Sequence, residues 1–386
     1  MEEWRSYKLQ DLTVDGKGHY GIGAPAVDYD ENLYTYLRIT DINDDGSLNY
    51  SGMKSVNDPE ANRYLLKEGD IVFARTGNST GRAYYYEPSD GKLVFAGFLI
   101  KFSLDPKKVN PRYLKYYTHS KPYYDWVQSF DTGATRGNIN AQTYGSMEIK
   151  LPPRNIQDQL VDVLSSLDKK IKLNNRINHN LEEQARIQFE AWCALCPDTK
   201  PIRELSSNIL DYTPNNHKKV ILLNSSDVTE GRFESLPFVD NQNLKGQFKK
   251  RFMKGDILYS EIRPRNHHYA ICYFDADEYI ASTRLMVIRK NDKMISSDAL
   301  LYQYLLMPLV LEEFTSKTES RSGTFPQGNF EDLSSSEVPY REDNSQIGKV
   351  LETMYGIIWS NLEENKRLVS LRDSLLPQLM SGQISC

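Results

Sequence analysis

Two long segments of the chain carry apolar residues at helical spacing, and a region of shorter apolar runs precedes each of them. The segments cover about residues 156 to 192 and 345 to 381, and their apolar positions recur every three to four residues. The preceding regions hold short apolar runs bounded by glycine, proline and asparagine, which predicts strands joined by turns. The pattern therefore predicts two globules of mixed helix and strand, each followed by a long amphipathic helix.

Both predicted helices fit a single heptad register. In the first helix the two core positions hold Leu160, Leu167, Asn174, Leu181 and Gln188, and Leu164, Ile171, Asn178, Ala185 and Trp192. In the second they hold Ile347, Met354, Asn361, Leu368 and Leu375, and Leu351, Ile358, Asn365, Arg372 and Leu379. Each helix should be roughly 55 Å long at about 1.5 Å per residue. Because both carry an apolar stripe, we expect each to pack against the other.

Asparagines fall at equivalent core positions of the two predicted helices. A buried asparagine tolerates only the alignment that satisfies its amide, so matched asparagines favour a seam with a fixed register. The alternative is a solvated asparagine on a bent helix. The coincidence of positions in both copies favours the seam.

The second half of the chain restates the first at an offset of about 187 residues. A turn leading into a buried strand occurs at Gly69-Asp70-Ile71 and again at Gly255-Asp256-Ile257. Polar, glycine-containing loops follow in both halves, and each leads to a proline-marked boundary. These loops are residues 133–138 and 322–329, and the boundaries are Pro152-Pro153 and Pro339.

Composition places the chain among globular proteins that fold in water. It has 386 residues, 39% of them apolar and 26% charged, which predicts two or three compact units. The acidic start lacks the features of a secretory signal, and no stretch approaches the length of a membrane span. We expect a cytoplasmic protein with reduced cysteines. Cys193 and Cys196 have half of a zinc-site spacing without a second pair, so a helix end is favoured over a metal site.

Several short motifs stand in order along the two halves. Besides the Gly-Asp-Ile pair, they are Arg75-Thr76-Gly77 with Gly81-Arg82, Leu151-Pro152-Pro153 with Gln159 before Leu160, and a closing segment from Leu371-Arg372 through Leu376-Pro377 and Leu379 to Gly382. With the repeat, they resemble the specificity subunit of type I restriction enzymes over nearly the whole chain. The second half departs from the pattern, because residues 260–265 replace the Arg-Thr-Gly loop and Tyr340 replaces the second proline. The DNA contacts that the resemblance implies are therefore assigned less directly to residues of the second half.

The resemblance implies an α+β fold of two pseudo-twofold-related target-recognition domains, separated by two long antiparallel coiled-coil helices. The implied boundaries are 1–152 for the first domain, 153–197 for the central helix, 198–339 for the second domain and 340–386 for the last helix. Each domain would read one half of a split target in double-stranded DNA. The helices would set the spacer and dock two methyltransferase subunits, and restriction-translocase subunits would join them.

The resemblance also implies that the chain is not an enzyme. Adenine-N6 methylation and DNA cleavage would belong to the partner subunits. S-adenosylmethionine, ATP and magnesium would bind there, and this chain would hold no cofactor or metal.

Residue types suited to reading DNA gather in the loops of both halves. Arginine pairs with guanine, amides pair with adenine, and hydroxyls or backbone amides contact phosphate. The candidates in the first half are Arg75, Thr76, Asn78, Ser79, Thr80, Arg82, Thr135, Arg136 and Asn138. Those in the second half are Arg263, Arg265, Asn266, His267, His268, Arg321, Thr324 and Gln327. For the loop of residues 75–82, a solvated hairpin is the plainer alternative.

Two other classes of protein remain open. The acidic pI of about 5.8 leaves open a coiled-coil scaffold or adaptor that binds no DNA. The net charge of −5 argues mildly against a protein that simply coats itself in nucleic acid. A stand-alone DNA-modifying enzyme is disfavoured, because neither a methyltransferase motif nor a phosphate-binding loop is visible. The paired tyrosines, such as Tyr116-Tyr117, are assigned to the core rather than to base stacking.

Overall fold

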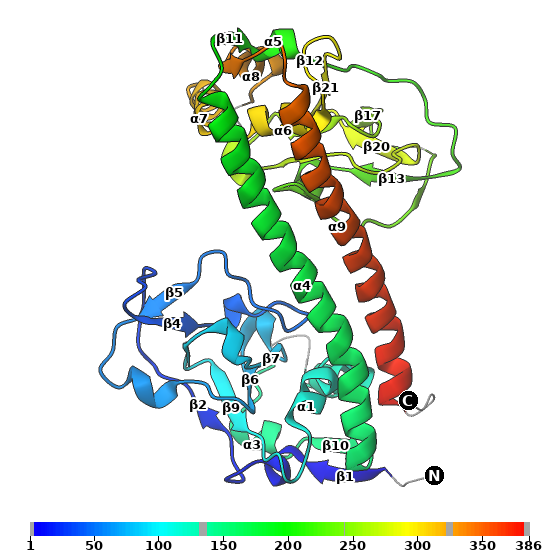
Figure 1. The fold of residues 1–386 in the computed structure, drawn as a ribbon. Coiled ribbons are helices and arrows are strands. Elements are labelled where there is room, and N and C mark those ends of the chain that lie inside the picture. The colour runs from blue at the N-terminus through cyan, green and yellow to red at the C-terminus, as the bar shows by residue number, and fades with distance from the viewer. Residues whose placement is uncertain (1–3, 131–136, 243, 322–326, 382–386) are drawn as a thin grey trace. The chain divides into compact units, whose positions relative to one another are not determined.

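The structure is a computed structural model that describes residues 4–130, 137–242, 244–321 and 327–381. The fold consists of two long helices, α4 (Arg154–Cys193) and α9 (Ser345–Met380), and two globules of strands and short helices (Figure 1). The chain divides into two compact units. Unit 1 comprises Met1–Ile171 with Lys366–Cys386, and unit 2 comprises Lys172–Asn365, so each unit holds one globule and a part of both helices. The predicted fold class is confirmed, and the finer domain boundaries stay predictions.

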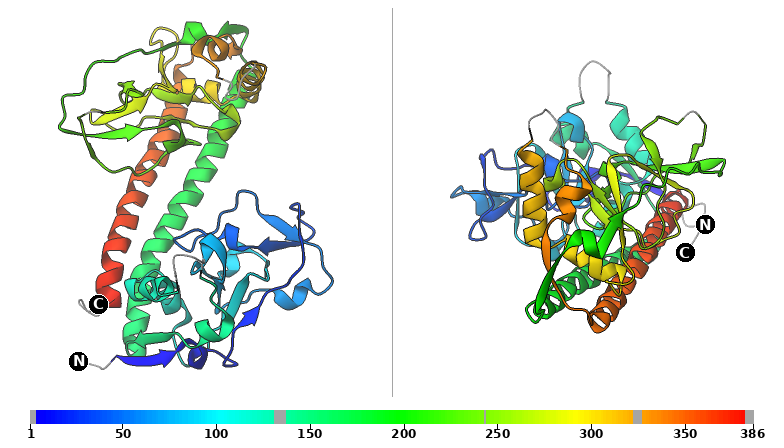
Figure 2. Two further views of the ribbon diagram at one scale, coloured as in Figure 1. Left: turned by 180° about the vertical axis from the view of Figure 1, so that it is seen from behind. Right: turned by 90° about the horizontal axis from the view of Figure 1, so that it is seen from above.

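The described residues of the globule in unit 1 form two four-stranded sheets and one separate strand pair. The first sheet has the order β2 (His19–Tyr20), β9 (Leu99–Ser103), β6 (Asp70–Ala74), β7 (Ala83–Tyr85), and the second β3 (Ala26–Val27), β5 (Lys54–Val56), β4 (Tyr34–Leu37), β8 (Leu93–Phe95). β1 (Arg5–Lys8) pairs with β10 (Glu148–Leu151). The short helices are α1 (Pro111–Tyr117), α2 (Lys121–Gln128) and α3 (Ala141–Gly145). Front and back views both place these strands on one side of the first part of α4 (Figure 2).

The globule of unit 2 repeats this plan. One sheet has the order β12 (Ser206–Asn208), β21 (Leu285–Lys290), β18 (Ile257–Ser260), β19 (Tyr269–Ile271), and the other β16 (Val239–Asp240), β13 (Lys219–Leu223), β20 (Tyr279–Ser282), β17 (Phe248–Lys250). Two strand pairs are β14 (Val228–Thr229) with β15 (Arg232–Phe233), and β11 (Asp198–Pro201) with β22 (Glu337–Tyr340). The helices are α5 (Ile202–Leu205), α6 (Asp298–Leu305), α7 (Pro308–Glu319) and α8 (Phe330–Ser334). Each second sheet contains a parallel pair, β4 with β8 and β13 with β20.

The repeated Gly-Asp-Ile motif makes the same turn in both units. Gly69 and Gly255 have φ values of 89° and 94°, a left-handed conformation that glycine adopts without a Cβ penalty. The following aspartate then accepts a hydrogen bond from the backbone amide three residues before it, at 2.8 Å for Asp70 and 2.9 Å for Asp256. The motif therefore serves to start the central strands β6 and β18.

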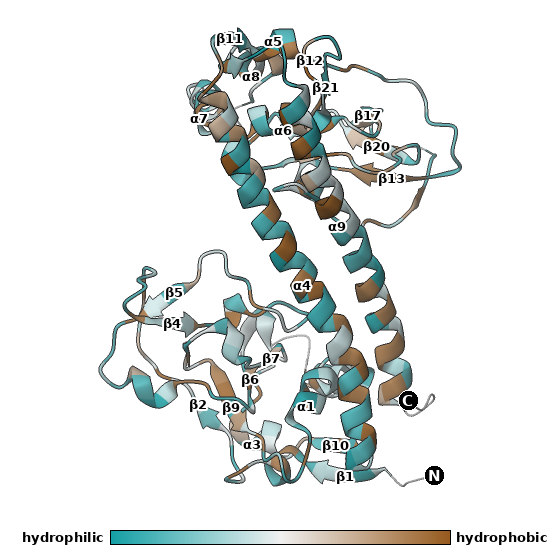
Figure 3. Ribbon diagram, in the orientation of Figure 1, coloured by the Kyte–Doolittle hydropathy of each residue, from teal (hydrophilic) through white to brown (hydrophobic). Residues whose placement is uncertain are grey.

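The long helices contribute to the core of each unit. In unit 1, Leu160 and Leu164 of α4 share one core with Leu376 and Leu379 of α9. In unit 2, Ala185 and Phe189 of α4 lie in a core with the α9 residues Ile347, Leu351 and Ile358. Apolar and polar stretches alternate along both helices in Figure 3, as an amphipathic heptad pattern requires.

The predicted asparagines meet inside unit 2. The Asn174 amide donates to Asn365 Oδ1 at 2.9 Å, and the Asn361 amide donates to Asn178 Oδ1 at 2.8 Å. Asn174 and Asn178 are buried. As the residue number rises along α4 it falls along α9, so the two helices run antiparallel within this unit. The remaining predicted seam residues vary in burial: Leu167, Ile171, Leu181, Met354 and Leu368 are half-buried.

Most of the abundant tyrosines belong to the core, as Tyr116, Tyr117 and Tyr123 illustrate. Among the described residues, none of the helices has the length and apolar character required to span a bilayer.

Candidate nucleic-acid interface

The two candidate loops of unit 1 lie against each other. The Ile139 backbone amide donates to the Arg75 carbonyl at 3.0 Å, and Thr80 Oγ1 donates to the Gly137 carbonyl at 3.0 Å. Asn78 and Asn138 are exposed on these loops, and Thr76 is half-buried. The predicted Thr135 and Arg136 lie outside the described residues. The strand end at Arg75 and the segment entering α3 therefore form one surface.

Arg75 is held at this surface by an aromatic ring. Its guanidinium carbon lies 5.1 Å from the centroid of the Tyr20 ring, a cation–π distance. Tyr20 is fixed in turn, because its hydroxyl accepts a hydrogen bond from the Ala141 amide at 3.2 Å. The Arg75 Nε is buried without a hydrogen-bond partner, and no carboxylate pairs with this arginine among the described residues. Within the described part of the chain, its positive charge thus has no carboxylate partner.

The other candidates of the first loop make contacts within the protein. Arg82 Nε donates to Asp44 Oδ1 at 2.6 Å, and a second Arg82 nitrogen donates to the Ile42 carbonyl at 3.0 Å. Ser79 is buried, and Thr80 bridges two backbone carbonyls, those of Gly77 and Gly137. These side chains hold the loop in shape.

The candidate loops of unit 2 meet in the same manner. The Gly328 backbone amide donates to the Glu261 carbonyl at 2.8 Å. The Gln327 side chain donates to Glu261 Oε2 at 2.6 Å and accepts from the guanidinium of Arg284, which is exposed. Thr324 lies outside the described residues. Sequence reasoning missed Arg284 because it looked for arginines inside the loops that match residues 75–82 and 133–138.

The remaining basic candidates of unit 2 are paired. Arg265 Nε and Nη2 donate to the two carboxylate oxygens of Glu319, at 2.6 and 2.8 Å, and Arg321 donates to Asp332 Oδ1 at 2.8 Å. Asn266 is exposed, and Arg263 is also exposed on a left-handed backbone with φ 48°.

The neighbouring histidines make separate contacts. His267 Nδ1 lies 3.2 Å from Glu230 Oε1, while His268 Nδ1 lies 3.0 Å from both Thr229 Oγ1 and the Val228 carbonyl. Within the described part of the chain, no group of three or more histidine, cysteine or acidic side chains is placed to hold a metal ion. Cys193 and Cys196 at the end of α4 are free thiols.

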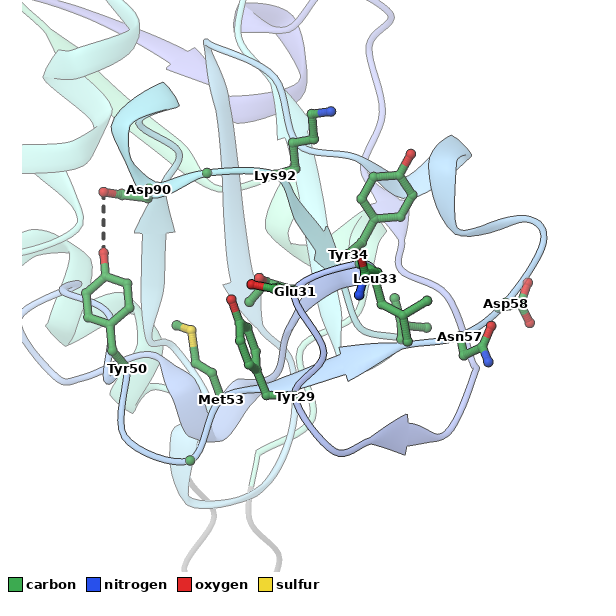
Figure 4. A pocket seen from close by; sticks show the side chains of 15 residues that line it. Tyr29, Glu31, Leu33, Tyr34, Tyr50, Met53, Asn57, Asp58, Asp90 and Lys92 are labelled. Carbon is green, nitrogen blue, oxygen red and sulfur yellow. Dashed lines mark hydrogen bonds between the residues drawn. The ribbon is translucent and has the colours of Figure 1, made fainter.

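Two cavities lie away from these loops. The larger one, of about 1160 Å³ in unit 1, opens between Tyr29, Tyr50, Met53 and Asp90 (Figure 4). The Tyr50 hydroxyl donates to Asp90 at 3.4 Å, and burial together with this carboxylate raises the pKa of Tyr50 to about 12. A second cavity, of about 530 Å³ in unit 2, has aromatic walls and a rim that includes Glu182, Glu183, Glu190 and Glu230. Carboxylates outnumber basic side chains in the lining of both cavities, which disfavours phosphate binding there.

Comparisons with known proteins bear on the first half of the chain in particular. Residues 1–183 match the family model described as the type I restriction modification DNA specificity domain. Over 163 residues, 42% of the chain, the sequence is 35% identical to the type I restriction enzyme HindI specificity subunit of Haemophilus influenzae. Over 163 residues, 41% of the chain, it is 27% identical to the StySPI specificity subunit of Salmonella potsdam. Each match spans 35% of the relative's own length.

One solved structure resembles the fold of nearly the whole chain. The S subunit of the type I restriction-modification system from M. genitalium superposes with a TM-score of 0.57 at 15% identity. The likeness covers 98% of this chain and 96% of the M. genitalium chain.

Proposed function

Because residues 1–183 match the type I restriction modification DNA specificity domain, we propose that the chain reads a two-part DNA sequence for such a system. Unit 1 reads one half of the target and unit 2 reads the other. The observation that carries this proposal is the repetition of one loop arrangement in both units, at the Arg75–Ile139 contact and again at the Glu261–Gly328 contact. Two equivalent reading surfaces suit two half-sites.

The chain contributes recognition in this proposal, and partner subunits contribute chemistry. Two methyltransferase subunits that use S-adenosylmethionine dock on α4 and α9, and restriction-translocase subunits that use ATP and magnesium join them. The support is physical, because both helices carry many exposed polar residues beside their buried apolar positions. We propose that the length of the helices sets the number of base pairs between the half-sites.

A methylation map of genomic DNA tests the proposal. Cells expressing the chain with its cognate methyltransferase subunit should methylate adenine in a split motif, and cells lacking only this chain should not. An active methyltransferase whose adenine methylation is unchanged by removal of the chain would refute the proposal.

The alternative of a scaffold that binds no DNA draws on the net charge of −5. Salt dependence separates the two functions. A complex that contacts phosphates should lose DNA affinity steeply as salt rises, because each neutralised phosphate releases counterions. A scaffold would show little affinity at any salt concentration. The measurement uses the chain together with its methyltransferase subunit, since their joint surface is the one that meets DNA.

A further inference from the structure

We infer that each unit reads a guanine through one arginine, Arg75 in unit 1 and Arg284 in unit 2. The same pair of hydrogen-bonded backbone positions occurs in both units, and the arginine stands at one position of the pair in unit 1 and at the other in unit 2. This inference rests on the proposed function and assigns the bases that the two units recognise. It follows from three observations: the equivalence of the backbone, the chemistry at each position, and the state of the other loop arginines.

The backbone around the two sites is equivalent, hydrogen bond for hydrogen bond. The amide of Arg75 donates to the Phe98 carbonyl at 3.1 Å, and the amide of Glu261 donates to the Arg284 carbonyl at 2.9 Å. Both strand ends then accept a hydrogen bond from the second loop, Arg75 from Ile139 and Glu261 from Gly328. Arg75 therefore corresponds to Glu261, and Phe98 corresponds to Arg284.

Unit 1 places its cation on the first position of the pair. The Tyr20 ring orients the Arg75 guanidinium, whose charge no carboxylate compensates among the described residues. The second position carries Phe98, with 57% of its surface exposed. An exposed phenylalanine next to an arginine that the Tyr20 ring orients is suited to a groove of DNA, where the phenylalanine can contact a thymine methyl group while the arginine reaches a guanine.

Unit 2 places its cation on the second position. Glu261 is mostly buried and lies 3.6 Å from the Nζ of Lys250, a buried lysine whose own amine also donates to the Leu285 carbonyl. Glu261 accepts from the Gln327 amide, and Gln327 in turn accepts from Arg284. Glu261 thus holds Gln327 in position, and Gln327 in turn positions the guanidinium of Arg284, which is exposed to solvent.

The bonding of three other loop arginines differs from that of Arg75 and Arg284. Arg82, Arg265 and Arg321 each contact a carboxylate, at 2.6 to 2.8 Å. Breaking such a contact on DNA binding would cost part of what the base contact supplies. Arg284 contacts a neutral amide instead and, among the residues that the structure describes, keeps most of its N–H donors. An arginine fork with free donors is the side chain that pairs in two places with guanine O6 and N7.

The experiment is a methylation map for single variants in the complete complex. The Arg75→Ala variant should relax one guanine position in one half-site, and Arg284→Ala should relax one in the other half-site. The controls are Arg82→Ala and Arg265→Ala, which remove arginines of the same loops that are already paired, and both should keep the wild-type motif. Arg75→Lys and Arg284→Lys keep the charge but lose the fork, so they should relax the same positions while methylation continues.

A binding measurement gives the magnitude. Against oligonucleotides in which that guanine is replaced, the wild-type complex should discriminate by about ten- to hundredfold, and the matching alanine variant by less than threefold. The lysine variants decide the case if an alanine variant fails to assemble. A split wild-type motif that stays unchanged in Arg75→Lys and Arg284→Lys, or one in which both arginines affect the same half-site, would overturn the inference while leaving the proposed function standing. A wild-type complex without a split motif would instead refute the proposed function.

Discussion

His119 is a histidine that unit 1 keeps neutral. Burial lowers its pKa to about 4, the cations Arg372 and Lys115 act in the same direction, and Asp45 and Asp168 oppose them. In the unfolded chain a histidine has a pKa of about 6.5. Between pH 6.5 and 4 the unfolded state therefore binds the proton that the folded state refuses. The free energy of unfolding is therefore unaffected by His119 protonation above pH 6.5, and it decreases as the pH falls from 6.5 toward 4.

This linkage predicts how a substitution changes acid stability. His119→Gln should remove a loss of about 1 to 2 kcal/mol in the free energy of unfolding between pH 7 and pH 5. Urea unfolding at the two pH values, followed by circular dichroism, measures it. His217→Gln, which replaces an exposed histidine, is the matched control for the substitution. An equal pH dependence in wild type and His119→Gln would contradict the prediction.

At the scale of single residues, the sequence predicted which loops carry DNA-type chemistry but not which side chains are free to use it. Arg82 and Arg265 look like Arg75 in the sequence. They differ because Asp44 and Glu319, 38 and 54 residues away, pair with them in the fold. Arg284 was missed for a related reason, since only the hydrogen bonds of the second unit place it opposite Glu261.

At the scale of elements, the asparagine seam gives a prediction about the helices. Asn178 is fully buried, accepts from the Asn361 amide at 2.8 Å and donates to the Ile358 carbonyl at 3.4 Å. Asn178→Leu should cost about 1 to 3 kcal/mol, because it leaves the Asn361 amide without its acceptor. The double variant Asn178→Leu with Asn361→Leu should recover most of that loss, since an apolar pair leaves no polar group unsatisfied.

Urea unfolding of wild type, both single variants and the double variant completes the cycle. A single variant as stable as wild type would show that the asparagines are solvated in solution. A double variant no more stable than the single variants would show that the stability lost in the single variants does not come from the broken Asn178–Asn361 pairing. Gln188→Leu, at an exposed core-register position of the same helix, serves as the control.

Heptad periodicity predicted both long helices to within about two residues of their observed ends, because an apolar stripe repeats many times over such a length. The sequence did not reveal that Asn174 also donates to Glu364 at 2.7 Å, since position 364 lies outside the core register. The outer strands of the second sheets were also beyond sequence reasoning. They are two or three residues long, as in β3 and β16, too short for an alternating pattern.

At the scale of the whole molecule, the two units should be separable in function. Replacing residues 1–150 by the matching segment of a relative with another target should change one half of the methylated motif and preserve the other half. The reason is that the loops of unit 1 are held by contacts with one another and with α3, which also belongs to unit 1. A methylation map of cells carrying the hybrid measures the outcome. Alteration of both half-sites would contradict independent reading.

The length of the helices gives the last prediction. Seven residues inserted into α4 after Ile171, with seven inserted into α9 after Asn365, lengthen both helices at the division between the units while keeping the heptad register. At about 1.5 Å per residue this adds about 10 Å, which corresponds to about three base pairs at 3.4 Å each. If helix length sets the gap, the complex with both insertions should methylate the same half-sites with a spacer longer by about three base pairs. The same insertion in the exposed segment 211–217 should leave the spacer unchanged, and an unchanged spacer after the helix insertions would mean that another part of the complex sets the gap.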